Sequence, residues 1–310
     1  MTTDYLHWLA QVLVFPGLLF TASAGLVTSW IDRKVTARVQ MRVGPPFLQP
    51  WYDFLKLLIK ETIVPAGGAK WLFLSAPLLG LGAVTLASTI IWRSQLAPHQ
   101  GFVGDVIVLL YLLTMPAVGT VLGAFSSRNP LASLGGSREM KLVMGYELPF
   151  VLAVLVPVIR AKSLRLGDIL AVEPSALAAS GVIALLVSVF CIQAKLTQVP
   201  FDLPEAETEL TGGAYIEYSG VPLALFKLTK AMMLFTLPVF LVALFGGGMG
   251  LQQGWAGLAA GIAKYLGIVI VLTLIRNTAP RVRIDQAVKF FWGPLTVAAA
   301  VAVGLALGGW

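Results

Sequence analysis

The sequence has little of the chemistry that metal-binding and disulfide-rich proteins need. Of its 310 residues only Cys191 is a cysteine, and only His7 and His99 are histidines. One cysteine cannot form a disulfide framework or hold an iron–sulfur cluster, and two distant histidines lack metal-ligand spacing. We therefore expect no metal and no cofactor in this chain.

Charge is also scarce, because only 12% of the residues are Asp, Glu, Lys or Arg, whereas soluble domains carry about 25%. Hydrophobic residues make up 57% of the chain and lie in blocks of about 20, the length of a helix that crosses a bilayer. No Lys or Arg precedes Arg33, so the first block lacks the basic start of a cleavable signal peptide. These features exclude an ordinary water-soluble enzyme and predict permanent membrane spans.

The apolar blocks predict an all-α, polytopic integral membrane protein with about eight transmembrane helices in a single domain, residues 1–310. The expected spans are 8–31, 71–92, 104–125, 141–160, 177–195, 221–245, 257–276 and 290–309. Segment 49–60 is expected instead to form an amphipathic helix along the cytoplasmic interface, because its polar residues share one helical face. These residues are Gln49, Asp53, Lys56 and Lys60.

The formal charge of +7 could indicate nucleic-acid binding, but a basic excess in a membrane protein more often reflects orientation signals. Lys and Arg concentrate in the loops between spans one and two, three and four, and seven and eight. The positive-inside rule then places both termini outside and loop 196–220, between spans five and six, in the cytoplasm. Nucleic acid is not expected as a partner.

Loop 196–220 is acidic on the side where basic residues are expected. Its carboxylates are Asp202, Glu205, Glu207, Glu209 and Glu217. The loop could simply be solvated, but Pro200 and Pro204 stiffen it, and Tyr215 and Tyr218 give it apolar surface. We therefore expect it to fold back on the bundle or to dock a partner. Partly desolvated carboxylates raise one another's pKa values, as a proton or ion relay requires.

Three further ionisable residues lie inside predicted spans. Glu147 lies six residues beyond Lys141 in span four, where a carboxylate is costly unless it faces protein or water. Lys227 and Lys230 share one face of span six. A structural ion pair between Glu147 and these lysines is one interpretation, and an ion-coupling path that includes all three is the other.

Basic residues surround the acidic loop on the same predicted surface. Those expected to dock a hydrophilic partner are Arg33, Lys34, Arg38, Arg42, Arg138, Arg281 and Arg283, with Arg276 beside them. The alternative is that they only orient the chain and bind lipid headgroups.

Four ordered motifs are distributed along most of the chain, and the resemblance that they carry covers nearly all of it. They are PFDLPEAETEL with YIEYSG, ARVQMRVGPPFLQPWYDFLKLL, GGSRE with YE, and RNTAPRVRID. Together they resemble the membrane subunit shared by energy-converting membrane-bound NiFe hydrogenases, such as the formate hydrogenlyase type, and respiratory complex I, where it is the quinone-chamber subunit. The short Gly44-Pro45-Pro46 run and the Ser137-Arg138-Glu139 triplet look more like the hydrogenase branch.

The resemblance implies a non-catalytic membrane-anchor and coupling subunit that links electron transfer in partner subunits to H⁺ or Na⁺ translocation. NiFe and iron–sulfur centres would lie only in the partners, which are hydrophilic hydrogenase-like large and small subunits. Antiporter-like membrane subunits and the lipid bilayer complete the expected partners, in a prokaryotic cytoplasmic (inner) membrane. By resemblance, the five loop acids and Glu147 would be the coupling carboxylates.

Three other functions remain open from the sequence. In the complex I version, a quinone enters between the helices and segment 49–60. A stand-alone ion-coupled transporter would use Glu147 and Lys230 as its ion site. A purely structural anchor would need none of these charges for activity.

Overall fold

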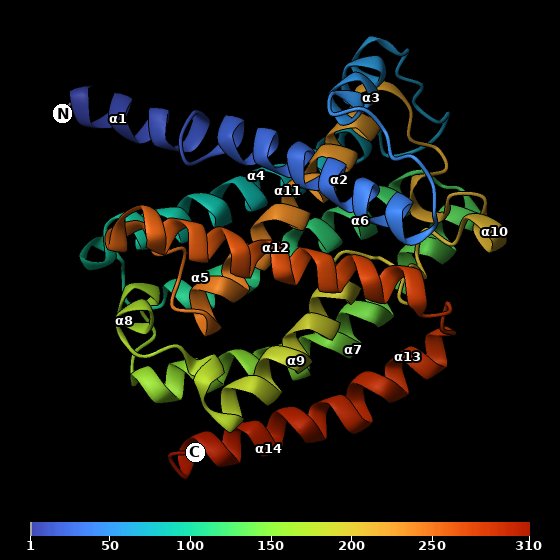
Figure 1. The fold of residues 1–310 in the computed structure, drawn as a ribbon. Helices are drawn as coiled ribbons and strands as arrows, with labels where there is room; N and C mark the ends of the chain where they lie inside the picture. Colours follow the sequence, from blue (N-terminus) through green and yellow to red (C-terminus); the bar gives the residue numbers. More distant parts are fainter. Residues whose placement is uncertain (1) are drawn as a thin grey trace.

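The described part of the chain is helical. The computed structural model describes residues 2–310, and the side chains that it leaves out are those of residues 2–7, Gln100, Glu207 and Thr208. Between residues 2 and 310 it contains α-helices, short 3-10 helices and one π-helical turn, but no strand. The prediction of an all-α fold is therefore confirmed (Figure 1).

The α-helices, in chain order, are α1 Thr2–Leu13, α2 Leu18–Val39, α3 Gln49–Ile59, α4 Lys70–Leu96, α5 Asp105–Leu112, α6 Met115–Ser126, α7 Pro130–Ala161, α8 Leu166–Ala171, α9 Ala179–Lys195, α10 Glu207–Leu210, α11 Gly220–Phe245, α12 Gly254–Thr278, α13 Ile284–Phe290 and α14 Thr296–Leu307. The 3-10 helices are η1 Pro98–Gln100, η2 Ser175–Leu177, η3 Gly213–Tyr215 and η4 Leu251–Gln253, and η5 Phe291–Leu295 is the π-helical turn.

Seven helical segments in the described chain are long and apolar enough to cross a bilayer. They are Trp8–Val39, Lys70–Leu96, Asp105–Ser126, Pro130–Ala161, Gly220–Phe245, Leu251–Thr278 and Ile284–Leu307. The remaining predicted span, 177–195, corresponds to α9, an apolar helix of 17 residues that extends for about 26 Å. The chain is thus a multi-pass membrane protein, as predicted.

Three of the predicted spans contain a break or a distortion beside a proline. The first divides into α1 and α2 around Pro16, the third into α5 and α6 just before Pro116, and the eighth contains the π-helical turn with Pro294. Proline lacks the N–H that an uninterrupted helix needs and clashes with the preceding turn. Pro77, Pro149, Pro157 and Pro238 lie inside helices that continue past them. A proline alone therefore does not fix where a span breaks, and hydropathy predicts continuous spans.

Helix α7 begins at Pro130, ahead of residue 141, where span four is predicted to start. Asn129 caps the helix by accepting a hydrogen bond from the Leu131 N–H, and Pro130 fits the first turn because its missing N–H is not needed there. The segment Gly135–Lys141, expected as a loop, is therefore helical. A hydropathy criterion missed it because its polar residues lower the local average.

Helix α11 lies at the centre of the bundle, in contact with α2, α4 and α12 (Figure 1). It is apolar on almost every face, and most of its side chains are buried. A helix that is hydrophobic all round is stable only when it is surrounded by other helices or lipid. The two polar faces of the protein therefore lie at the two ends of α11.

Helix α3 lies beside the bundle, against α2 and α11, and is not one of the spans (Figure 1). Pro50, Phe54 and Leu57 are turned toward the bundle, whereas Leu55 and Ile59 are exposed. The predicted amphipathic helix is confirmed, but it has two apolar faces. One face packs on protein, and the other is free to enter a membrane surface.

Both chain ends lie at the end of the bundle opposite α10 (Figure 1). A chain that crosses the membrane an even number of times has both of its ends on the same side. Which of the two faces is cytoplasmic stays a prediction from the distribution of Lys and Arg.

Candidate coupling site

The acidic loop between α9 and α11 folds back against the bundle. Phe201, Leu203 and Leu210 are buried. The Tyr218 ring stacks on Phe73 of α4 with ring centroids 4.0 Å apart, and its hydroxyl donates to the Phe73 carbonyl over 3.0 Å. The alternative of a purely solvated loop is therefore wrong.

Gly135 allows the loop to approach α7 closely, and Gly213 allows two parts of the loop to approach each other. A Cβ on Gly135 of α7 would lie 2.6 Å from the Ala214 nitrogen and 2.9 Å from the Pro204 oxygen. Gly213 has a φ of 53°, and a Cβ there would lie 1.8 Å from the same oxygen. These contacts leave no room for a side chain, so the loop rests backbone to backbone on α7.

Four of the five predicted loop carboxylates each contact a different part of the bundle. The pairs are Asp202 with Arg281, Glu205 with Lys230 at 2.6 Å, Glu209 with Arg138 at 2.6 Å, and Glu217 with the Asn129 amide at 2.5 Å. The side chain of Glu207 lies outside the described ones. The loop is thus attached through its charges to α7, α11 and the segment after α12.

Glu147 pairs with Lys195, at the end of α9, and not with Lys230 or Lys227. Its carboxylate lies 3.2 Å from the Lys195 ammonium, and Thr114 lies 3.2 Å from both groups. The expected pairing of Glu147 with the span-six lysines is therefore wrong. Lys230 is engaged by Glu205, which the folded-back loop places beside it.

Lys195 is the most deeply buried base of the site. Its side chain is 1% exposed, and the rings of Tyr146 and Phe150 each lie 5.0 Å from its ammonium. Cation–π contacts with both rings add to the ion pair with Glu147. A buried ammonium is tolerable only with such compensation.

Glu139 was not identified as a site residue from the sequence, although it belongs to the Ser137-Arg138-Glu139 triplet. It lies on α7 two turns before Glu147, is 1% exposed, and its Oε2 has no hydrogen-bond partner among the described residues. The signal that could have identified it is the capped start of α7 at Asn129, which places the triplet inside a helix.

A small cavity of about 40 Å³ connects these groups. Glu139, Lys195, Lys230, Thr197 and Tyr215 line it together with apolar neighbours. That volume holds at least one water molecule. The geometry therefore arranges Glu205 and Lys230, then Glu139, then Lys195 and Glu147, in a row from the loop into the bundle.

The predicted docking residues separate into bonded and exposed groups. Arg33 pairs with Asp53 of α3 at 2.7 Å, while Arg138 and Arg281 are bonded to loop carboxylates. Lys34 is partly buried, whereas Arg38, Arg42 and Arg283 are exposed. Only this last group presents free surface for a partner in the isolated chain.

Lys227 is exposed on α11 and lines two open cavities beside the row of charges. One cavity, of about 400 Å³, lies between α2, α3 and α11, and the other, of about 350 Å³, lies between α11 and the acidic loop. No carboxylate pairs with Lys227 among the described side chains. The structure therefore places Lys227 apart from Glu147.

A second buried pair, Asp32 with Arg276, was also missed. Their atoms are 2.6 Å apart, and Thr273 donates a hydrogen bond to the same carboxylate over 2.9 Å. Arg276 was grouped with the surface bases in the sequence, but it joins α12 to α2. Its partner was not predictable because 244 residues separate them.

Four groups outside the spans have shifted pKa values, and one of them is Tyr218, whose pKa is raised by burial. Burial raises the pKa of Tyr215 well above its ordinary value, and the nearby charge of Glu205 raises it further. Its hydroxyl therefore stays protonated, 3.0 Å from Thr120. The hydrogen bond and charge of Arg138 lower the pKa of Glu209. Burial would raise the pKa of Asp53, but hydrogen bonds from Arg33 and Gln49 outweigh it and lower that pKa.

The helical bundle, its folded-back acidic loop and the buried charges beneath that loop define a polytopic membrane subunit with a charged polar face. The chain matches the NADH dehydrogenase family over residues 11–307. It therefore belongs to that family, as a membrane subunit of the H type in complex I-like oxidoreductase complexes. The resemblance drawn from the four motifs is confirmed, and the chain is a multi-pass inner-membrane protein.

Two bacterial relatives illustrate the similarity. The H subunit of the NADH-quinone oxidoreductase of Geobacillus thermodenitrificans (strain NG80-2) is 35% identical over 301 residues, covering 91% of this chain and 90% of the relative. The protein of the same name from Syntrophotalea carbinolica (strain DSM 2380 / NBRC 103641 / GraBd1) is 34% identical over 301 residues, covering 89% and 88%.

A solved structure agrees with the fold. A chain in the membrane-bound sulfane sulfur reductase, an archaeal respiratory membrane complex, matches with a TM-score of 0.85 and 28% identity. The match covers 93% of this chain and 96% of that chain.

Proposed function

We propose that this chain anchors a hydrophilic NiFe-hydrogenase-type arm to the membrane and couples its electron transfer to H⁺ or Na⁺ translocation. The arm consists of large and small subunits that carry the NiFe and iron–sulfur centres. Antiporter-like membrane subunits adjoin this chain and carry the ions. Electrons do not enter this chain, and its part is mechanical and electrostatic.

The observation that carries this proposal is the row of charges between the loop and the bundle. Glu205 and Lys230 are joined at 2.6 Å, and Lys195 and Glu147 at 3.2 Å, with Glu139 and a water-sized cavity between the two pairs. Ion pairs in a low-dielectric site interact strongly, so a change in one pair alters the free energy of the next.

The folded-back loop supplies the mechanical part of the coupling. A partner that docks on the exposed side of the loop and shifts Glu205 would leave Lys230 without its carboxylate. Lys230 would then attract the nearest buried acid, Glu139, across the cavity. Proton or ion movement along the row follows from that exchange of partners, because no buried charge is stable alone.

Purification of the intact complex through a tag on this chain tests the proposal. We expect copurifying NiFe-hydrogenase-like subunits and ion uptake by sealed liposomes when the reconstituted complex turns over with hydrogen or a low-potential donor. The purified chain alone should transport nothing. Transport by the chain alone would replace the proposal with the stand-alone transporter, and pumping that survives neutral substitutions along the row would replace it with the structural anchor.

The complex I version is the second candidate, and one cavity favours it. The space of about 400 Å³ between α2, α3 and α11 is lined on α3 by the face that is turned toward the bundle, and it is large enough for a small ligand. Quinone that copurifies with the complex, together with inhibitor-sensitive quinone reduction, would decide for this candidate.

A further inference from the structure

A groove between α9, α11 and α12 has the properties of a binding site for one lipid chain. Its volume is about 510 Å³, and apolar side chains line nearly all of it, among them Leu177, Val189, Leu241 and Ile268. On α12 its lining extends from Lys264 to Val271, about 11 Å at helical rise. One leaflet of a hydrocarbon core is about 15 Å thick, half of roughly 30 Å. The groove therefore spans most of one leaflet, as a site for one acyl chain requires.

Lys264 is the one charged residue among the described side chains that line this groove. It lies on α12 about 14 Å from Trp255 at helical rise, on an exposed face of the helix. Its ammonium donates to the Gly246 carbonyl over 2.7 Å, and the described residues offer it no carboxylate. An ammonium has three donors, so two remain for a ligand.

The position of Lys264 sets the direction in which a lipid would lie. Gly246 ends α11, so the lysine reaches toward the polar face opposite the acidic loop. A cation at hydrocarbon depth is costly without an anion or water. A phosphodiester at the mouth of the groove would supply the missing negative charge while its chain follows the helices inward.

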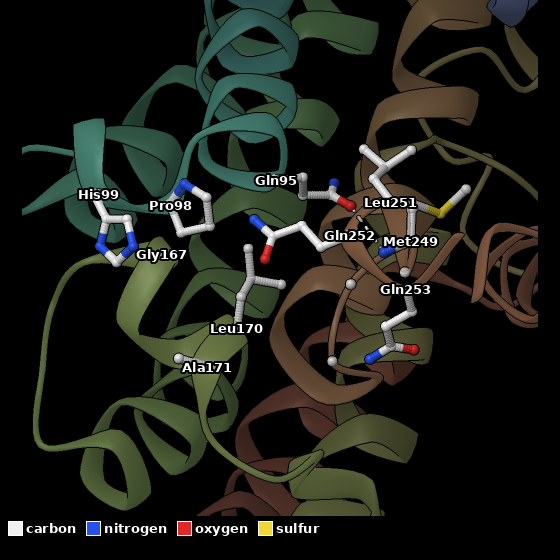
Figure 2. Close-up of a pocket in the computed structure, with 13 residues that line it drawn as sticks. Gln95, Pro98, His99, Gly167, Leu170, Ala171, Met249, Leu251, Gln252 and Gln253 are labelled. Atoms are coloured by element: carbon white, nitrogen blue, oxygen red, sulfur yellow. Dashed lines mark hydrogen bonds between the residues drawn. The ribbon is translucent and has the colours of Figure 1, made fainter. Parts of the chain in front are cut away.

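A polar pocket of about 240 Å³ adjoins the same end of the groove (Figure 2). Pro174 lines the groove, and Gly247 lines the pocket; a Cβ on Gly247 would lie 3.1 Å from the Pro174 ring. Figure 2 shows the pocket between the segment of Pro98 and His99 and the turn that carries Met249 and Gln252.

The pocket offers amides and no acids. Gln95, Gln252 and Gln253 line it, and none of the described residues around it is acidic. Gln95 is 5% exposed; its Oε1 accepts from the Met249 N–H over 2.9 Å, while its Nε2 has no partner among the described residues. Neutral amides hydrogen-bond hydroxyl groups well, whereas an ammonium headgroup would find no counter-charge here.

We propose that this groove binds one phospholipid with a hydroxyl-bearing, anionic headgroup of the phosphatidylglycerol type. The acyl chain lies between α9 and α12, the phosphate pairs with Lys264, and the glycerol hydroxyls face the amide-lined pocket. This site is separate from the row of charges, which lies at the other end of α11.

The test uses the intact complex, reconstituted in mixed phosphatidylglycerol and phosphatidylethanolamine, then stripped by detergent and analysed for retained lipid by mass spectrometry. Gly267 lines the groove, and a Cβ there meets no atom within 4 Å, so Gly267→Phe places a ring at the groove without a clash at the Cβ. The matched control is Gly304→Phe, an exposed helical glycine on α14 with an equally open Cβ position.

We expect the wild-type complex and Gly304→Phe to retain phosphatidylglycerol selectively, and Gly267→Phe to lose the tightly bound lipid. Lys264→Gln should keep a chain in the groove but reduce the preference for phosphatidylglycerol by roughly tenfold, as loss of a charged hydrogen bond predicts. Unchanged lipid retention in Gly267→Phe overturns the proposal. So does loss of a partner subunit from Gly267→Phe without loss of lipid, which would show that a helix fills the groove. An unchanged headgroup preference in Lys264→Gln overturns the role of the lysine.

Discussion

At the scale of single residues, the pair of Glu147 and Lys195 distinguishes coupling from anchoring. Lys195 is almost completely buried, whereas the Glu147 side chain is 31% exposed in the isolated chain. The two charges are thus unequally desolvated, and Lys195 depends on the pair more than Glu147 does. Removal of the acid leaves the base uncompensated, which costs on the order of 3–5 kcal/mol where a pair is fully buried.

We expect Glu147→Gln to assemble poorly, and the assembled fraction to exchange electrons with an artificial dye while losing most ion pumping. The double variant Glu147→Gln with Lys195→Gln should recover assembly, because no unpaired charge remains, but not pumping. Glu209→Gln, which is exposed and bonded to Arg138, should show the same separation more mildly. Subunit stoichiometry, dye reduction and ion uptake in sealed vesicles measure the three quantities. Full pumping by an assembled Glu147→Gln complex would remove this residue from the mechanism.

At the scale of elements, the contact between α7 and the acidic loop depends on a missing side chain. We expect Gly135→Ala to separate the two by forcing a Cβ against the backbone of Ala214 and Pro204, at a cost of about 1–3 kcal/mol. The loop should become accessible to proteases and the thermal transition should fall. Gly145→Ala, on the same helix, meets Phe291 at an ordinary 3.8 Å and should change neither. Equal behaviour of the two variants would contradict backbone contact at Gly135.

The attachment of α3 should depend on pH through Asp53. Its pKa is lowered in the folded protein, so the ion pair with Arg33 contributes fully above the unfolded value of about 3.9 and is lost as pH falls through the lower folded value. Both side chains are about two-fifths exposed, so we expect a contribution of about 0.2–1 kcal/mol. Hydrogen exchange of α3 should be up to about fivefold faster in Asp53→Asn than in the wild type at pH 7.

That difference should disappear once the pH falls below the lowered folded pKa of Asp53, where the carboxyl is protonated in both states. Comparison of the variant with the wild type at each pH cancels the intrinsic pH dependence of exchange. A difference that persists below that pKa would mean that the asparagine acts by another route than loss of the charge.

At the scale of the whole molecule, partner docking should involve the exposed bases at the end of α2 and just after it. We expect Arg38→Ala with Arg42→Ala to weaken attachment of the hydrophilic arm, and increasing salt to weaken attachment of the wild type in the same way. The control pair is Lys56→Ala with Lys60→Ala, exposed bases on α3 and directly after it. Sedimentation of the detergent-solubilised complex over a salt series measures the retained arm. If the Arg38 and Arg42 variant retained the arm at all ionic strengths, these residues would serve only to orient the chain in the membrane.

The orientation of the bundle is the second prediction at this scale. The basic loops predict that both termini are external and that the acidic loop is cytoplasmic. Fusions of an alkaline phosphatase reporter to either terminus should be active, and a cysteine introduced beside Glu205 should react with impermeant reagents only from the cytoplasmic side. If that cysteine were labelled from outside intact cells, the acidic loop would be external. The hydrophilic arm could then not dock on it from the cytoplasm, and the proposed function would be wrong.

The sequence by itself determined that the chain lies in lipid, that it is helical, and which family it belongs to. Apolar blocks of about 20 residues require lipid, and the four motifs indicated the family. These properties are local, because each depends on residues that are neighbours in the chain. The acidic loop and Glu147 were likewise visible as charges in unexpected places.

Only the tertiary structure decided which charges meet. Glu147 and Lys195 are 48 residues apart, and Asp32 and Arg276 are 244 apart. Helical periodicity gives the face on which a side chain lies, but not which helix packs there. The folded-back loop places Glu205 beside Lys230. Because α7 starts at Pro130, Glu139 lies within the helix, and its side chain is buried. The partners of buried charges depend on packing between distant segments, and the sequence of each segment alone does not contain that information.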